Sequence, residues 1–565
     1  MPSGRPSSSA QLPPSIRKQI IILSAILTHF KVANSPPKSR KRDDTDLAFL
    51  QSIASILTTG SPDSPTAPLV NALWKSASSD TNTPAIELIF TQNHRPAKLT
   101  HSTPSSTFTN IIPNTEKGED LLERWSSYSG LVYFLFSLPL LIHPSVSDTT
   151  YKQHLQDVVD VLAYISTTSN IKHLMDFIVF LHWRAYHKLL SQVKQFSAQW
   201  GTKFFDLPLS KPQIDYLSNE GLTATNPNEK IFAVTTENLD LWIRTFSRLW
   251  KTLSSEISNI VLCIPAPKSL RPSTTRFPVI CFLISTLCAM REVFQHLLMC
   301  TSMGFHVDLR RREGLMFAQR EERHKHGQKG ELLDLQAADE FSSESKESLP
   351  DQVYRSFGTI LSWHTSALAL WEHRNVFSTQ FRARRLSYVD MSSCSFTVND
   401  VNEVWKKIQK KSLTTKNTST FAQHSASLQK AMRSLTTSIS AQHATVYAEA
   451  ILMAHILHEV TSGRLSKACV KDGAFAIGVS KKSCGLCQHL ADTIHNEDEK
   501  ITFHLPGTHA TIFPWAPPLH LPQTVLLSIR DCLLAAAANP TLSHSRMSSG
   551  AGSEADRKSL LEMTE

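Results

Sequence analysis

The chain lacks the features that mark membrane, secreted and repeat proteins. Its longest apolar stretches, residues 131–142 and 277–290, reach only about a dozen positions and contain Ser, Pro or Cys, whereas a membrane-spanning helix needs about 20 apolar residues. Arg17, Lys18 and His29 interrupt the first apolar run, so no segment of the signal-peptide type lies near the start. No repeat of fixed period is visible. We therefore expect a protein without membrane contact.

The cysteines do not form a disulfide framework. The nine of them are an odd number, are spread over 565 residues, and mostly lie in apolar helical stretches. This distribution is typical of a reducing compartment, so we expect an intracellular protein, cytoplasmic or nuclear. The basic cluster at residues 38–42 has two interpretations, a nuclear-import signal or a solvated linker.

No strong excess of charge of one sign is present. Charged residues make up 19% of the chain and hydrophobic residues 41%, which are globular values, and the formal net charge is +9. A mildly basic surface favours anionic partners such as a nucleotide or nucleic acid, but it is also a common general property of surfaces. Nothing in the sequence identifies a protein partner. The length predicts two or three domains with disordered flanks.

Composition and periodicity divide the chain into regions. They are a disordered start (1–14), short helices and linkers (15–118, with 80–118 as loop), a helical domain (119–375) with a charged insertion (308–345), a C-terminal α/β domain (425–540) and a disordered tail (541–565). Apolar residues at three- and four-residue spacing predict helices at 151–164, 171–200, 239–260, 277–304 and 352–374. The insertion is interpreted as a solvated helix or mobile loop, with a nucleic-acid-contacting arm as the alternative.

Chemistry is concentrated in the C-terminal region. The sequence Val446-Tyr447-Ala448-Glu449 lies in a predicted helix at 445–460, and a short apolar strand at 474–479 precedes a helix that starts at Cys484. This start carries the pair Cys484 and Cys487, and a helix N-terminus favours thiolates and metal binding. The alternatives are a redox dithiol or two ordinary buried cysteines, and for Glu449 a surface helix position.

These motifs resemble a known family. The order V-x-A-E-x-x-L, I-G-x-S-K-x-x-C-x-x-C and G-T-H-A-T-I-F-P-W-A-P (507–517) is similar to the fungal nucleic acid/nucleotide deaminases of the cytidine-deaminase-like superfamily. The resemblance implies a three-layer α/β/α domain after an all-helical N-terminal region, so the expected fold class is α + α/β. It also implies a Zn²⁺ ion held by Cys484 and Cys487, with Glu449 transferring protons during removal of a nucleobase amine.

Two positions depart from the family pattern. Tyr447 stands where the family has its His ligand, and Ser483 stands where a Pro is usual. Tyrosine is a rare zinc ligand beside thiolates, because its pKa is near 10. Three outcomes follow: weak ligation by Tyr447, a substitute donor, or an empty site. The substitute donors are His443, which lies one helical turn before Tyr447, His489 and His509.

The segment after the predicted strand at 500–504 is expected to line the substrate pocket. The resemblance implies that His509 and Trp515 lie near the base, and the alternative is a packed loop in which Trp515 is a plug. Two functions compete: a zinc-dependent deaminase of a nucleobase, impaired by Tyr447, and a non-catalytic deaminase-like scaffold for interactions or nucleic acid. A zinc-stapled structural protein without a base pocket is a weaker third.

Overall fold

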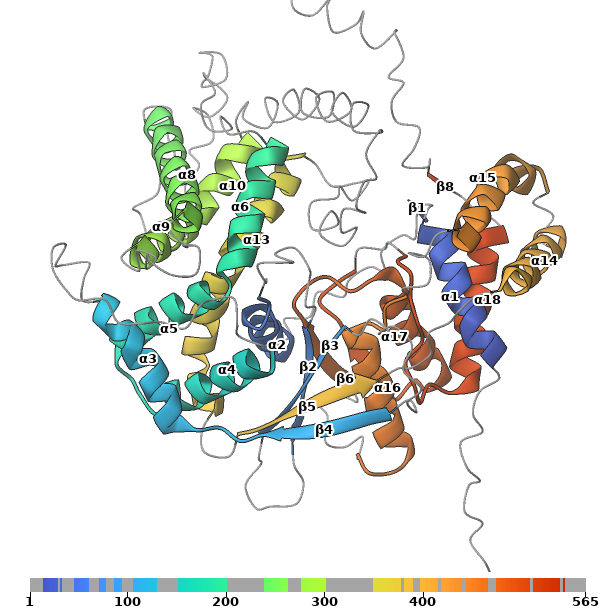
Figure 1. Ribbon diagram of the computed structural model, residues 1–565, viewed down its shortest axis with the longest axis horizontal. Helices are drawn as coiled ribbons and strands as arrows, with labels where there is room; N and C mark the ends of the chain where they lie inside the picture. The colour runs from blue at the N-terminus through green and yellow to red at the C-terminus, as the bar shows by residue number, and fades with distance from the viewer. Residues whose placement is uncertain are drawn as a thin grey trace, which may run out of the picture. The chain divides into compact units, whose positions relative to one another are not determined.

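The computed structural model describes most of the chain in separate segments (Figure 1). They are residues 14–28, 31–32, 45–59, 71–77, 86–93, 105–129, 151–200, 238–262, 276–300, 349–377, 381–389, 397–414, 418–437, 444–465, 474–508, 512–538 and 542–543. The charged insertion 308–345 and the termini 1–13 and 544–565 lie outside the described residues, as do His443 and His509. The predictions made for them therefore stay predictions.

The chain folds into two compact units, and unit 1 is built from three separate stretches. Unit 1 contains residues 1–54, 70–111 and 382–565, and unit 2 contains residues 55–69 and 112–381. The α/β part of the molecule therefore does not lie only within 425–540: N-terminal segments and residues 382–389 belong to the same unit. A domain boundary drawn on local composition misses this, because sheets pair strands that are distant in sequence.

Unit 1 contains a six-stranded sheet of order β4-β5-β3-β2-β6-β7. Its strands are β2 (Asn71–Ala77), β3 (Ile86–Gln92), β4 (Ser105–Ile111), β5 (Arg382–Val389), β6 (Ala474–Val479) and β7 (Thr502–His504). β2 is antiparallel to both of its neighbours, β3 and β6, whereas β6 and β7 are parallel. The prediction of a loop over 80–118 was wrong, because β3 and β4 lie there.

Helices cover the sheet near β6. Phe475, Ile477 and Val479 alternate along β6 and join the apolar core of unit 1, as period-2 side chains on one strand face do. On the opposite face, Gly478 lies against α2 (Thr45–Ile56): a Cβ at Gly478 would lie 2.3 Å from the backbone carbon of Leu50. A glycine is therefore required where this helix and strand approach each other.

Six further helices of unit 1 lie within the described residues. They are α1 (Pro14–Thr28), α14 (Val398–Thr414), α15 (Thr418–Thr437), α16 (Ala448–Thr461), α17 (Gly485–Glu497) and α18 (Gln523–Ala538). α16 packs on β2, β3 and β6, and α17 packs on β7 and α18. The short strands β1 (Lys31–Val32) and β8 (Leu542–Ser543) pair with each other in a separate ladder.

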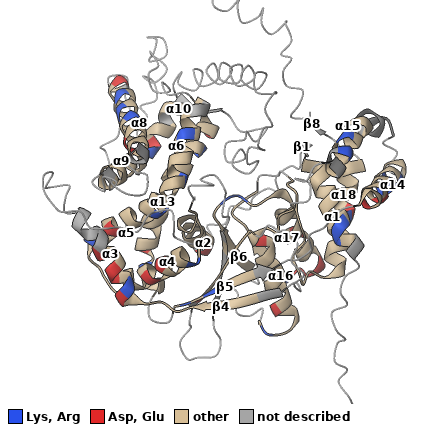
Figure 2. Cartoon of the chain, in the orientation of Figure 1, with Lys and Arg blue, Asp and Glu red and all other residues tan. Residues whose placement is uncertain are grey.

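Within the described residues, unit 2 is helical. Its elements are α3 (Thr115–Ser129), α4 (Tyr151–Ile165), α5 (Ile171–Arg184), α6 (Tyr186–Trp200), α8 (Leu239–Leu262), α9 (Arg276–Ala289), α10 (Arg291–Cys300), α13 (Leu349–Glu372) and the 3₁₀ helix η4 (Arg374–Phe377). Two predicted helices are each broken in two, at Ala185 and at Met290. Both acidic and basic residues lie on α3 and α8 (Figure 2).

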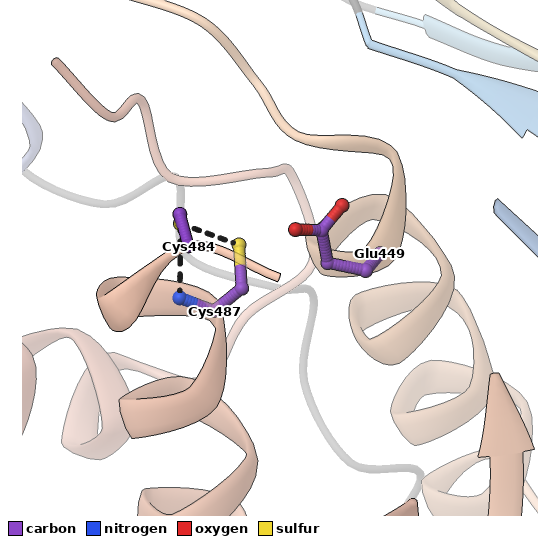
Figure 3. Close-up of side chains that lie close together, drawn as sticks. All are labelled: Glu449, Cys484 and Cys487. Atoms are coloured by element: carbon purple, nitrogen blue, oxygen red, sulfur yellow. Dashed lines mark hydrogen bonds between the residues drawn. The ribbon is translucent and has the colours of Figure 1, made fainter. Parts of the chain in front are cut away.

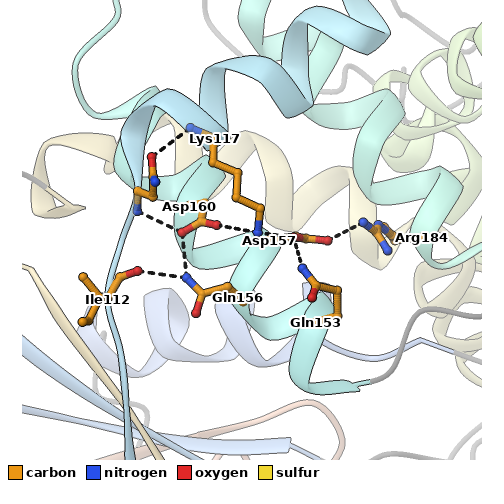
Figure 4. A network of polar contacts seen from close by, with 8 residues as sticks. Ile112, Lys117, Gln153, Gln156, Asp157, Asp160 and Arg184 are labelled. Atoms are coloured by element: carbon orange, nitrogen blue, oxygen red, sulfur yellow. Dashed lines mark hydrogen bonds and ion pairs between the residues drawn. The ribbon is translucent and has the colours of Figure 1, made fainter. Parts of the chain in front are cut away.

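A buried ionic network joins three helices of unit 2 (Figure 4). Lys117 of α3 contacts Asp157 at 3.1 Å and Asp160 at 3.2 Å, both on α4, and Arg184 of α5 contacts Asp157. The two aspartates are almost fully buried, so their charges need these cations. The network explains why α4 carries acidic residues on its inner face. Across the described parts of the chain, no helix is long and apolar enough to cross a membrane.

Candidate metal and proton-transfer site

The first side of the site is the start of α16. Tyr447 is the N-cap residue, with extended backbone angles and no capping bond from its side chain. The cap comes from a distant strand: Asn93, directly after β3, accepts a hydrogen bond at its Oδ1 from the backbone N–H of Ala448 at 2.8 Å. The prediction that Thr445 starts the helix was wrong, because Thr445 instead pairs with Trp515 in an isolated bridge. Asn93 thereby fixes the orientation of the first turn of α16.

Glu449 lies in this first turn and is almost completely buried, with 1% of its surface exposed. Burial raises the pKa of its carboxyl group, while its own backbone N–H, the Cys487 thiol and the backbone of Cys484 act in the opposite direction. Its Oε2 atom has no hydrogen-bond partner among the described residues. A carboxyl group in such surroundings is suited to holding and releasing a proton.

The second side of the site is the start of α17. Cys484 is its N-cap residue, and the Cys484 sulfur accepts a hydrogen bond from the backbone N–H of Cys487 at 3.3 Å. The two sulfur atoms are 3.1 Å apart, and both side chains are buried. Burial and the neighbouring Cys484 and Glu449 raise the pKa of the Cys487 thiol. The predicted strand 474–479 and the helix start at the first cysteine agree with the structure.

Ser483 ties this turn to the loop after β7. Its backbone N–H and its hydroxyl group both donate hydrogen bonds to the Gly507 carbonyl, at 2.9 and 2.7 Å. Gly507 has φ +103, a conformation that favours glycine. A proline at position 483 would lack both the N–H and the hydroxyl, so the serine supplies two contacts that a proline could not make.

The two helix starts bring three donor side chains together (Figure 3). One ligand atom each from Glu449, Cys484 and Cys487 lies within 4.8 Å of the others. Among the described residues this is the one group of three or more His, Cys, Asp or Glu side chains close enough to hold a metal ion. His489 is not part of the group, and its Nε2 is buried without a partner in the described parts. Tyr447 is buried in the same apolar core.

Trp515 closes the site on a third side. Its side chain is fully buried. The indole lies beside Cys487, where it acts to lower the pKa of the thiol, although Nε1 makes no hydrogen bond of ordinary geometry with any described residue. Thr445 holds the Trp515 segment in place, because its N–H donates to Pro514 and its carbonyl accepts from Ala516. Trp515 is both a packed plug and a neighbour of the thiol pair.

No prediction from the sequence included Asn93 or the contacts of Trp515 with the N-terminal helix. The signal for Asn93 was the short run Ile86-Glu87-Leu88-Ile89-Phe90 between prolines at 84 and 96, which is typical of a strand. No local signal pointed to α1, whose Ser24 contacts the backbone of Trp515 across 491 positions of sequence.

Comparison with known proteins agrees with this geometry. Residues 446–519 match a family model described as an OTT_1508-like deaminase. The matched residues include α16, β6, α17, β7 and the Trp515 segment. The C-terminal part of the chain therefore contains a deaminase-like domain. The match covers less than half of the chain. No curated protein and no solved structure matches the chain.

Proposed function

We propose that unit 1 is a zinc-dependent deaminase-like domain that removes an exocyclic amine from a nucleobase, in a free nucleotide or in nucleic acid, with activity lowered by Tyr447. The observation that carries this proposal is the convergence of Glu449, Cys484 and Cys487 within 4.8 Å at two helix starts. The family match over the same residues supports the same chemistry. The resemblance of the sequence motifs to the fungal nucleic acid/nucleotide deaminases supports membership in that family.

The donor set fits a zinc ion, but with fewer strong ligands than usual. Cys484 and Cys487 would hold the ion at the N-terminus of α17, and the charge of a bound metal would offset the burial that raises the pKa of the Cys487 thiol. A catalytic zinc site has three protein ligands and a water. In the pattern that the motifs resemble, the third ligand position corresponds to Tyr447, which would be a weaker ligand than an imidazole; a substitute donor or an empty position are the alternatives. When bound, zinc lowers the pKa of a water molecule to about 7.

Glu449 would carry the proton transfers. Hydrolysis adds the oxygen of water to the amine-bearing carbon and breaks the carbon–nitrogen bond, so a carbonyl group and ammonia are formed. The Glu449 carboxylate would pass one proton of the water to the leaving nitrogen, and the second would end on the adjacent ring nitrogen as the carbonyl group forms. Its burial and raised pKa suit this exchange.

Two buried donors support a base-sized ligand beside this group. Asn93 Nδ2 and Trp515 Nε1 have no hydrogen-bond partner among the described residues, and Glu449 Oε2 has none either. Buried polar groups in proteins are almost always hydrogen-bonded, so unmatched ones indicate a missing ligand or water. A nucleobase offers carbonyl and ring-nitrogen acceptors to the two donors and an amine to the carboxylate.

We further propose the three-layer α/β/α arrangement for unit 1, with the helical region of unit 2 as a separately folding domain. Two contacts support the layers. Gly478 lies against α2 on one face of the sheet, and α16 packs on the other face, in the core that contains Phe475, Ile477 and Val479. The five cysteines whose side chains are described are all free, which supports a reducing, intracellular location.

A second function is favoured by Tyr447 itself. If this residue leaves the metal too weakly held to activate water, the domain is a non-catalytic scaffold for interactions or nucleic acid. The fold would be retained because Tyr447, Glu449 and both cysteines are also part of the buried core.

The test combines metal content with deaminase assays. Zinc per chain and ammonia release would be measured for the wild type, Tyr447→His, Glu449→Gln and Cys484→Ser, on cytosine-, adenine- and guanine-containing nucleotides and on single-stranded DNA and RNA. We expect weak zinc binding in the wild type and near-stoichiometric zinc in Tyr447→His. Deamination should appear or rise in Tyr447→His.

Adding Glu449→Gln to Tyr447→His should abolish that deamination while the zinc stays bound. Zinc-loaded Tyr447→His without activity on any of these substrates would favour the scaffold. Absence of zinc from both the wild type and Tyr447→His would refute the metal site.

A further inference from the structure

The N-terminal helix α1 contacts the loop that closes the site. Ser24 lies on α1 and is fully buried. The backbone N–H of Trp515 donates a hydrogen bond to Ser24 Oγ at 2.9 Å, and the same hydroxyl lies 3.3 Å from the Trp515 carbonyl and 2.9 Å from the Ile21 carbonyl. One hydroxyl group therefore meets both backbone polar groups of Trp515. Arg17, two turns earlier, also donates to the Pro517 carbonyl.

This contact acts on the side of Trp515 opposite to Thr445. The Thr445 backbone accepts from Ala516 at 3.0 Å and donates to Pro514 at 3.1 Å, so the tryptophan is held from both sides. Thr445 lies just before the α16 start. The backbone of the Trp515 segment is thus fixed between α1 and the chain entering α16.

We infer that Ser24 is a positioning residue of the metal site, acting through Trp515. With its backbone fixed by Ser24, the Trp515 segment keeps its pairing with Thr445, which directly precedes the α16 start that carries Glu449. Groups behind the residues that surround a metal hold those residues in position. The zinc-affinity readout rests on the proposed metal site, whereas the readout of the Trp515 environment rests on geometry alone.

The experiment uses the full chain and a matched control on the same helix. Ser24→Ala removes the hydroxyl that meets Trp515. Thr28→Ala removes a hydroxyl one turn later that donates to the Ser24 carbonyl at 2.8 Å and, among the described residues, to no other group. Zinc affinity is measured by chelator competition. In parallel, the chain is labelled with 5-fluorotryptophan, and its ¹⁹F spectrum is recorded, with the Trp515 resonance assigned by Trp515→Phe.

We expect Ser24→Ala to weaken zinc binding by up to about 10-fold, the lower end of the cost of losing a direct partner of a metal ligand, and to move the Trp515 resonance. Thr28→Ala should change neither. A Ser24→Ala chain with an unmoved Trp515 resonance overturns the inference, as does one with unchanged zinc affinity. If the wild type binds no zinc, the proposed metal site fails, and the ¹⁹F comparison alone decides the role of Ser24.

Hydrogen exchange on the wild type keeps the inference testable if Ser24→Ala does not fold. The Trp515 amide should exchange as slowly as the amides in the middle of α16, because Ser24 accepts from it in a fully buried position. Fast exchange at Trp515 with slow exchange in α16 would refute the contact.

Discussion

Gly478→Ala tests the packing that positions the thiol pair. A Cβ at this position of β6 would lie 2.3, 2.4 and 2.5 Å from the backbone carbon, the Cβ and the carbonyl oxygen of Leu50. Two of these atoms belong to the α2 backbone, so no side-chain rotation relieves the overlap. The strand and helix must separate, and inserting one methyl group into a packed core costs ~1–3 kcal/mol. Because backbone must move, we expect a value near the upper end, ~3 kcal/mol.

The consequence should be visible in stability and in the site. For a unit of this size, a loss of ~3 kcal/mol lowers the melting temperature by about 6–12 °C. Separation of β6 from α2 also shifts the chain leading to Cys484, so metal binding should weaken. Thermal unfolding followed by circular dichroism and zinc titration measure the two effects.

Gly463→Ala is the matched control for this substitution. Gly463 has φ +71, and a Cβ there would meet nothing within 4 Å, so the substitution has only the left-handed backbone cost, ~1–2 kcal/mol. Metal binding should be unchanged by it. If Gly478→Ala were as stable as the wild type, or less damaging than Gly463→Ala, the close approach of β6 and α2 would be refuted.

Three further predictions concern other parts of the chain. In unit 2, Gly118→Ala should destabilise the fold, because its Cβ would lie 2.2 Å from a backbone oxygen of α4. Gly358→Ala should instead stabilise α13 by ~1 kcal/mol, because its Cβ would meet only a side chain, at 3.6 Å. Urea unfolding measures both, and equal effects of the two substitutions would contradict the packing of Gly118 on α4. His154 and His182 are fully buried, and burial lowers the pKa of each to about 4. Because the unfolded chain takes up these protons first, stability is full above pH 6.5 and falls between pH 6.5 and 4, by ~2 kcal/mol per histidine at pH 5; urea unfolding of His182→Gln should show a shallower pH slope, and an identical slope would contradict this. Asn93→Ala should lower the free energy of unfolding by ~1 kcal/mol, because α16 loses its cap, whereas Asn93→Asp should keep most of that stability. Equal melting temperatures for the two variants would contradict the capping role of Asn93.

Local patterns in the sequence predicted those helices and strands that are specified by residues adjacent to one another in the chain. The strand Ala474–Val479 and the helix after Cys484 were recognisable from a short apolar run followed by a cap-like start. The C-x-x-C spacing places two thiols on one helix turn, whatever surrounds it. The helical periodicity of unit 2 was likewise visible, but the breaks at Ala185 and Met290 were not, because apolar spacing continues across them.

The assembled site depended on contacts between residues far apart in the chain. The strands β2 and β3 join β6 only through hydrogen bonds between distant segments. Asn93 caps α16 across 355 positions, and Ser24 holds Trp515 across 491. Burial of Glu449, which raises its pKa, also results from packing. The sequence by itself determined which side chains could do chemistry, and only the tertiary structure decided that Glu449 and the two thiols meet, since burial and strand pairing depend on the whole folded chain.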